Sequence, residues 1–155
     1  MALSLNLDKT VDETKKEAGA KLILDLKKVG MTRMDAKSRV AFGQRISEMG
    51  VTKAHVADMR MEIDMARLLV LKAAWAMDKF GNKEARQQIA MIKVAVPNIT
   101  SKVVDRCLQL HGAGGVSQVF KLASMYAHQR TLRLADGPDE VHRDQVGRLE
   151  IAKYN

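Results

Sequence analysis

Three acids gather around a Gly-Pro turn near the end of the chain, in the run Arg133-Leu134-Ala135-Asp136-Gly137-Pro138-Asp139-Glu140-Val141-His142. A carboxylate such as Asp136 can act as a general base when it is buried beside a substrate and its pKa is raised. The structural alternative is a helix start, because Asp before Gly-Pro is a common N-cap and acids in a first helical turn complement the helix dipole. The residue types alone therefore indicate either proton abstraction or helix capping at Asp136.

A second candidate site is the glycine-rich end of a predicted helix, Gln109-Leu110-His111-Gly112-Ala113-Gly114-Gly115. Glycines permit positive φ and let a ligand approach the backbone closely, and a single glycine would be enough to end a helix. Glycine-rich helix ends also serve simply as C-caps, so the segment predicts either a ligand-binding backbone or a cap. We expect His111 by itself to be a hydrogen-bonded cap and not a catalyst.

A third candidate site is Arg39-Val40-Ala41-Phe42-Gly43, in which a cation precedes a turn of small residues. Such an arginine can bind an anionic ligand. Near a helix end it is more often solvated or bonded to backbone carbonyls. The segment therefore indicates a ligand site only if an anion binds beside it.

Helices must position these segments, because apolar residues recur at three- and four-residue steps over most of the chain. Strand signals are almost absent, and glycine and proline are concentrated at a few places. We therefore predict an all-α protein, an up-and-down helical bundle. The expected helices are Thr10 to Gly30, opened by a capping box; Thr32 to about Glu48; Thr52 to Phe80, ended by Gly81; Asn82 to His111, kinked or split at Pro97; Gln118 to Leu134; and a last one with Pro138 in its first turn.

The composition indicates one domain that is held by packing alone. A chain of 155 residues, 46% of them hydrophobic, can bury one continuous core. The single cysteine, Cys107, cannot form an internal disulfide, and no Cys/His cluster has zinc spacing. Asp139-Glu140-Val141-His142 is one imperfect copy of a motif that a di-iron bundle needs twice, so we expect no metal. The 10 methionines suit gaps between packed helices.

The charge distribution and the apolar stretches exclude other classes of protein. Net charge is +8, but the basic residues are interleaved with acids and aromatics are only 4%, so we expect no nucleic-acid partner. The nearly uncharged stretch Ile89 to Ile99 is interrupted by Lys93 and Pro97 and is too short to span a bilayer. Met1 to Thr10 resembles neither a signal peptide nor a transit peptide, so we expect an intracellular location.

Taken in this order, the three segments resemble the acyl-CoA dehydrogenase family, whose C-terminal domain carries Arg-x-x-Phe-Gly, Gln-x-x-Gly-Gly and a base-bearing Glu-Gly-Thr turn. Stretches between them are similar too, including Ala66-Arg67-Leu68-Leu69 and Ala73-Ala74-Trp75-Ala76-Met77-Asp78. The large members ten and eleven of that family share the run from Arg133 to His142 almost unchanged, and in their branch the base is an aspartate. The resemblance covers about residues 36–153.

The resemblance implies FAD-dependent α,β-dehydrogenation of an acyl-CoA to a trans-2-enoyl-CoA. It implies that Asp136 is the catalytic base and that Gly137 lies against the substrate. It also implies a homodimer or homotetramer built on these helices and, in a eukaryote, a mitochondrial or peroxisomal location, otherwise a cytoplasmic one. The residues implied in FAD binding are Arg39, Ala41, Gln109, Leu110, His111, Gly112, Ala113, Pro138, Asp139 and Glu140, of which Gln109 to Ala113 would hold the adenosine and diphosphate across a subunit interface.

Departures from the family pattern limit what we expect of the chain. The family's His-Gln pair for flavin falls on Met49-Gly50, and the first helix is about two turns shorter. We therefore divide the chain into a poorly matched segment with a shortened first helix, residues 1–35, and a bundle, residues 36–155. In the family an N-terminal helical domain and a middle β-domain precede this bundle, so we expect no turnover from this chain alone. The alternative is a non-catalytic oligomerisation or interaction module that keeps the family fold.

Overall fold

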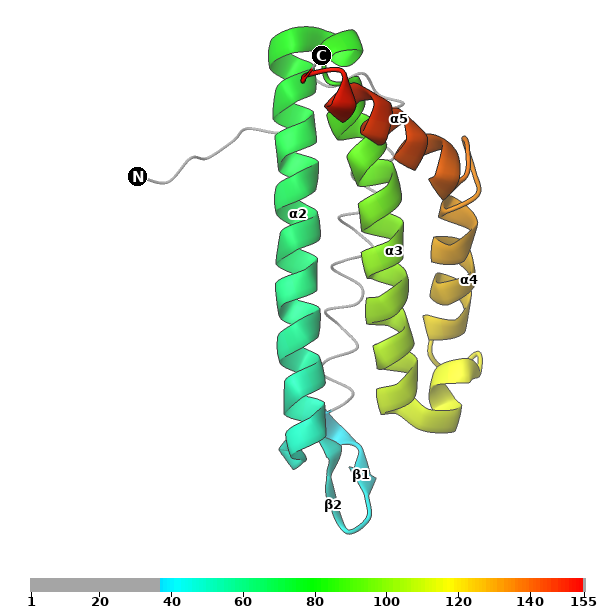
Figure 1. Cartoon of the computed structure of the whole chain (residues 1–155). Helices are drawn as coiled ribbons and strands as arrows, with labels where there is room; N and C mark the ends of the chain where they lie inside the picture. The colour runs from blue at the N-terminus through cyan, green and yellow to red at the C-terminus, as the bar shows by residue number, and fades with distance from the viewer. Residues whose placement is uncertain (1–36, 155) are drawn as a thin grey trace.

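Two long antiparallel helices form the centre of the computed structural model, which describes residues 37–154. Helix α2 (Gly50–Glu84) and helix α3 (Arg86–His111) lie side by side over most of their length (Figure 1). The apolar periodicity noted in the sequence is confirmed on α2, because apolar residues at three- and four-residue steps are buried against the bundle. They include Met59, Ile63, Ala66, Val70 and Ala73.

The main hydrophobic cluster lies where α2, α3 and α4 (Leu122–Leu132) pack together. It joins residues of α2 and α3 to Leu122 at the start of α4 and to Ile46 in the short 3-10 helix η1 (Ile46–Glu48). Burial of this apolar surface stabilises the helices far more than their intrinsic propensities do. The members contributed by α2 and α3 are Met59, Ile63, Val103, Val104, Cys107 and Leu110.

Gly81 and Pro97 behave differently, although both were expected to interrupt helices. Gly81 has φ 79° and ψ 166°, so regular helical geometry breaks there as predicted, even though the hydrogen-bond pattern of α2 continues to Glu84. Pro97 is buried inside α3, which runs unbroken to His111, so the alternative that Pro97 splits this segment is wrong. Proline removes one backbone donor, and the tertiary packing of a long buried helix compensates for that loss.

The helix expected from Thr32 to about Glu48 is wrong from Val40 to Arg45, although Lys37 and Ser38 are helical and Ile46–Glu48 forms the 3-10 helix η1. Strands β1 (Val40–Ala41) and β2 (Gln44–Arg45) form a hairpin instead, with Val40 opposite Arg45 and Ala41 opposite Gln44. Its two-residue turn has positive φ at Phe42, 55°, and at Gly43, 78°, as tight hairpin turns require. The helix expected from Thr10 to Gly30 lies outside the described residues.

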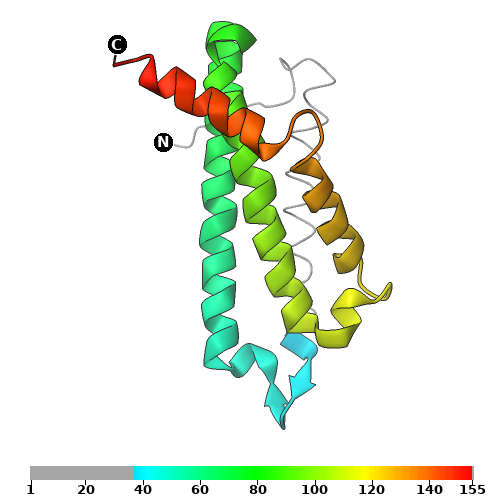
Figure 2. The same ribbon diagram turned by 45° about the vertical axis from the view of Figure 1, so that its right-hand side comes forward.

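Helix α4 runs antiparallel to α3 and alongside it (Figure 1). Helix α5 (Asp139–Ile151) crosses α3 near its N-terminal end (Figures 1 and 2). The 3-10 helix η2 (Gly112–Val116) turns the chain from α3 towards α4. Helix α4 is shorter than the expected Gln118 to Leu134, and Pro138 caps α5 from the position just before its first residue. The described residues thus confirm an all-α bundle in which α3 contacts the other helices.

Candidate functional site

The candidate residues lie at the two opposite ends of α4. The glycine segment (residues 109–115) and the hairpin meet at the end where α4 begins, whereas the Asp136 turn (residues 133–138) follows the end of α4 (Figure 1). Because α4 has 11 residues, its length is about 17 Å. The structure therefore brings the first two predicted sites together and keeps the third apart from them.

Arg39 lies directly on the glycine segment. Its Nη1 donates a hydrogen bond to the backbone carbonyl of Leu110, which is the carbonyl-bonded alternative expected for this arginine. A Cβ atom at Gly112 would lie 2.6 Å from Nη2 of Arg39, and Gly112 has φ 60°. Gly112 is thus favoured by its positive φ, and a side chain there would also displace the Arg39 guanidinium group. Ala41, next to the hairpin turn, packs against the main hydrophobic cluster.

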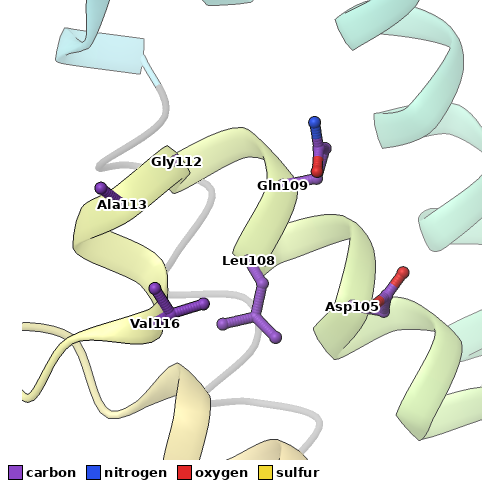
Figure 3. A pocket seen from close by; sticks show the side chains of 6 residues that line it. All are labelled: Asp105, Leu108, Gln109, Gly112, Ala113 and Val116. Carbon is purple, nitrogen blue, oxygen red and sulfur yellow. The ribbon is translucent and has the colours of Figure 1, made fainter.

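A shallow pocket of about 370 Å³ lies along the junction of α3 and η2 (Figure 3). Three residues predicted to bind the nucleotide part of FAD line it, namely Gln109, Gly112 and Ala113. The other three lining residues were not predicted as site residues: Asp105, Leu108 and Val116. A volume of this size suits one part of a dinucleotide and is small for a whole one.

His111 and Leu110 point into the protein and do not line this pocket. Nδ1 of His111 lies 2.8 Å from the carbonyl of Cys107, so Nδ1 carries the proton, because a carbonyl can only accept. The ring packs edge-on against Phe120, with centroids 4.8 Å apart. His111 is buried, and its Nε2 has no hydrogen-bond partner among the described residues. His111 is therefore hydrogen-bonded within its own helix as expected, but the C-cap of α3 is Gly112 and not His111.

Asp136 does not cap the helix that follows it. The N-cap of α5 is Pro138, without a side-chain cap hydrogen bond, so the capping alternative for Asp136 is wrong. Asp136 is exposed and has φ 52°, and Gly137 has φ 98°. A Cβ atom at Gly137 would lie 3.2 Å from Nε2 of His142, which leaves little room for any other residue there. The turn thus presents the Asp136 carboxylate on the surface of the bundle.

Asp139 joins three helices and is only 3% exposed. Its Oδ2 accepts hydrogen bonds from Nδ2 of Asn98 at 2.9 Å and from Nε of Arg133 at 2.8 Å. Burial raises the pKa of Asp139, but the two hydrogen bonds and the charges of Arg133 and Arg143 outweigh it and leave the pKa below its ordinary value. Asp139 was predicted to flank FAD, and its side chain is engaged inside the bundle. Its neighbours Pro138 and Glu140 are exposed.

Lys93 on α3 crosses to the Asp136 turn. Its Nζ donates to the carbonyls of Leu132, at 2.7 Å, and of Gly137, at 3.3 Å. Nε2 of His142 lies 3.1 Å from the carbonyl of Asp136. Sequence reasoning noted Lys93 only as a charge that interrupts an apolar stretch. The position of Lys93 in an apolar stretch could have indicated its role. A lysine that is partly buried by its apolar neighbours requires hydrogen-bond acceptors for its ammonium group.

Residues 37–154 supply no group of three or more His, Cys, Asp or Glu side chains that could hold a metal ion. Over the same residues, no helix is both long and apolar enough to cross a membrane.

Comparison with known proteins identifies the bundle. Residues 27–150 match the family model described as acyl-CoA dehydrogenase, C-terminal domain. The chain is 49% identical over 117 residues to a probable acyl-CoA dehydrogenase, FadE2, of Mycobacterium tuberculosis, covering 76% of this chain and 29% of that protein. It is 50% identical over 116 residues to acyl-CoA dehydrogenase family member 11 of Rattus norvegicus, covering 75% of this chain and 15% of that protein.

A solved Mycobacterium abscessus structure that bears the acyl-CoA dehydrogenase name has the same fold, with a TM-score of 0.84 and 42% identity, covering 89% of this chain and 34% of that one. The chain therefore belongs to the acyl-CoA dehydrogenase family and corresponds to its C-terminal helical domain. It spans less than a third of the length of the curated relatives described above.

Proposed function

We propose that this chain is the C-terminal helical part of an FAD-dependent acyl-CoA dehydrogenase that converts an acyl-CoA to a trans-2-enoyl-CoA. The observation that carries the proposal is the Asp136 turn, which presents an exposed carboxylate that does not serve as a helix cap. Relatives that are about half identical and carry the dehydrogenase name support it.

In this proposal the carboxylate of Asp136 removes the α-proton of the acyl-CoA thioester. FAD, when bound, supplies the acceptor for the β-hydrogen, which leaves as hydride. The base must stand on one face of the substrate, so the direction of the Asp136 side chain matters more than its exposure in the free chain. Gly137 would lie against the substrate beside the base, on the side of its backbone that His142 does not occupy.

The residues at the other end of α4 fit the adenosine and diphosphate part of FAD. The pocket at Gln109, Gly112 and Ala113 is lined partly by backbone, and the Arg39 guanidinium lies against Gly112 and carries the charge that a diphosphate requires. Asp105 can accept hydrogen bonds from ribose hydroxyl groups on the α3 side. Since α4, which is about 17 Å long, lies between this pocket and the Asp136 turn, the two ends would serve different parts of an extended cofactor or different subunits.

The outer face of α2 supports assembly into a homodimer or homotetramer. Four large apolar side chains on that face are exposed, opposite the buried stripe, and they recur at helical spacing. Exposed large apolar side chains gathered on one helix face are typical of a protein interface, although the exposed Lys72 lies between Leu68 and Trp75 on this face. We call this set the outer stripe: Met61, Met65, Leu68 and Trp75.

Sedimentation velocity tests the assembly. Leu68→Glu places a charge in the middle of the outer stripe and should shift the protein towards monomer. Val119→Glu, at another exposed apolar residue away from α2, should not. Equal effects of the two substitutions would argue against an interface on α2.

The base assignment is tested in a complex with the parts of the family that hold the flavin ring, supplied as a companion chain. Asp136→Asn should abolish reduction of flavin by acyl-CoA and leave flavin affinity nearly unchanged. Asp144→Asn, at an exposed carboxylate on α5 that belongs to none of the predicted sites, is the matched control and should keep the wild-type rate. Retained reduction in Asp136→Asn would overturn the assignment.

The second candidate function is a non-catalytic oligomerisation or interaction module, which the outer stripe also favours. Its signature is colourless protein that assembles without flavin, even when the companion chain is present. Bleaching of a flavin spectrum by acyl-CoA in the complex would exclude it. We expect no turnover from the chain by itself under either proposal.

A further inference from the structure

We propose that Lys93 is a positioning residue for Asp136: its ammonium group ties together the two sides of the Asp136 turn and keeps the Asp136 backbone left-handed. The inference rests on the proposed function, because the orientation of Asp136 matters for chemistry only if Asp136 is the base. Lys93 acts through backbone carbonyls, and no contact with substrate or cofactor is assigned to it.

The backbone of Asp136 needs such a constraint. Its φ of 52° is in the left-handed region, which residues other than glycine adopt rarely, although Asp and Asn are the best tolerated. A conformation of this kind persists only where the surrounding structure forces it. The side chain of Asp136 is exposed and is not used as a cap, so the constraint has to act on the backbone.

The hydrogen bonds of Lys93 bracket Asp136. Leu132 precedes Asp136 and Gly137 follows it, and the carbonyls of both accept from the same Nζ atom, at 2.7 and 3.3 Å. His142 adds a contact of 3.1 Å to the Asp136 carbonyl from α5. A single ammonium group that binds both sides of a turn fixes the path of the chain between them.

A simpler role for Lys93 would be to cap α4. Lysine side chains often bond the last carbonyls of a helix, and Leu132 is the last residue of α4. Capping does not explain the bond to Gly137, which lies outside α4. The two roles predict different results, because a cap stabilises the helix without setting φ at Asp136.

The Asp139 cluster anchors the same turn at its ends. The backbone N–H of Asp139 donates to the carbonyl of Arg133 at 3.2 Å, and the Asp139 side chain binds Arg133 and Asn98. These contacts fix where the turn leaves α4 and where it enters α5. Backbone hydrogen bonds from the N–H groups of Leu134 and Ala135 to the Thr131 carbonyl hold the chain as far as Ala135. None of these contacts reaches Asp136 or Gly137, so the conformation of those two residues depends on Lys93 and His142.

The test measures the conformation of Asp136 in the full 155-residue chain by NMR. Three-bond couplings and the intraresidue HN–Hα NOE report the sign of φ. Lys93→Met removes the ammonium group and keeps most of the side-chain length, Lys93→Arg keeps the charge and the donors, and Lys102→Met is the matched control, an exposed lysine on the same helix. If Lys93→Met does not fold, as judged by circular dichroism, Lys93→Gln is measured in its place.

We expect positive φ at Asp136 in the wild type, in Lys102→Met and in Lys93→Arg, and averaging towards negative φ in Lys93→Met. If a folded Lys93→Met chain has a lowered melting temperature but keeps positive φ at Asp136, Lys93 only caps α4. That result would overturn the proposal. Failure of Lys93→Arg to restore positive φ would also count against it.

Kinetics in the complex with a companion chain separate this proposal from the proposed function. Lys93→Met should lower kcat for flavin reduction about tenfold to a hundredfold and change KM little, because a misdirected base affects the transition state more than binding. Wild-type kcat in Lys93→Met would overturn the positioning role. If Asp136→Asn remains active, the proposed base is wrong, whereas the NMR result at Asp136 still decides what Lys93 does.

Discussion

The two ends of α4 hold their neighbouring segments by opposite means. At the Asp136 turn, charged and amide side chains from α3, α4 and α5 converge on backbone carbonyls and on the buried Asp139 carboxylate. At the glycine segment, order comes from missing side chains, because Gly112 and Gly115 allow close approach of Arg39 and of the Leu108 backbone. The first end should therefore be sensitive to the loss of a charge, and the second to the gain of a methyl group.

The largest effect should come from removing the charge at the centre of the polar end. Asp139→Ala leaves Nε of Arg133 without its acceptor and removes one of the two acceptors of Asn98, whose Nδ2 also donates to the Val94 carbonyl. It should lower the free energy of unfolding by about 3 kcal/mol, the low end for a buried pair, because Arg133 is 31% exposed. Urea unfolding at neutral pH measures it. Asp144→Ala is the control, since its pair with Arg148 is exposed and should contribute less than about 1 kcal/mol. Equal losses of unfolding free energy in Asp139→Ala and Asp144→Ala would show that the Asp139 contacts do not hold this end of α4.

The same contact should make stability depend on pH. The pKa of Asp139 is lowered on folding from its ordinary value of 3.8, so its contribution is complete above that value and is lost as pH falls through the folded pKa. The stability difference between wild type and Asp139→Asn should therefore stay constant from neutral pH to about pH 5 and shrink in stronger acid. Thermal unfolding of both proteins over this range is the measurement. A difference that grows in acid would contradict the ionised, hydrogen-bonded carboxylate.

At the glycine end, the addition of one methyl group should be harmful. A Cβ atom at Gly115 would lie 2.7 Å from the carbonyl oxygen of Leu108 and 3.1 Å from its Cα, and this backbone belongs to α3 and cannot move aside. Gly115→Ala should lower the free energy of unfolding by about 2 kcal/mol. Urea unfolding measures the change, and a neutral result would show that η2 is looser than the structure indicates.

The smallest effect should have the opposite sign. Gly147 lies inside α5, and a Cβ atom there would meet nothing within 4 Å. Gly147→Ala should raise the free energy of unfolding by about 0.5–1 kcal/mol, because alanine loses less backbone entropy in a helix. The melting temperature should rise in Gly147→Ala and fall in Gly115→Ala. Opposite shifts would show that close packing makes Gly115 necessary, whereas shifts of the same sign would argue against this.

Sequence reasoning predicted the helices better than the links between them. The break at Gly81 and the start of the last helix beside Pro138 follow from local backbone chemistry, and both are confirmed. The hairpin at Val40–Arg45 was missed, because its turn is Phe42-Gly43 and not one of the usual Asn-Gly or Asp-Gly pairs. Phe42, 98% exposed, also gave this segment an apolar residue that suited a helix pattern.

The candidate site likewise contains residues that were predicted from the sequence and residues that were missed. Gln109, Gly112 and Ala113 were predicted together and do share a pocket, since neighbours in sequence at a helix end are also neighbours in space. Lys93, Asn98 and Arg133 were missed, and Asp139 was predicted as a cofactor contact although its side chain is buried in their network. No spacing rule connects Lys93 to Gly137, 44 positions away, or Asn98 to Asp139, 41 positions away.

The sequence by itself determined the helical class, the end of α3 at His111, the start of α5 next to Pro138 and the segments at which chemistry could occur. It could do so because apolar periodicity, glycine conformations and proline geometry act over a few residues. Only the tertiary structure decided that Asp136 is not a cap, that Asp139 is an internal anchor and that Lys93 spans the Asp136 turn. Those outcomes depend on which side chains meet when α3, α4 and α5 pack, and hydrogen bonds across packed helices leave no periodic trace in the sequence.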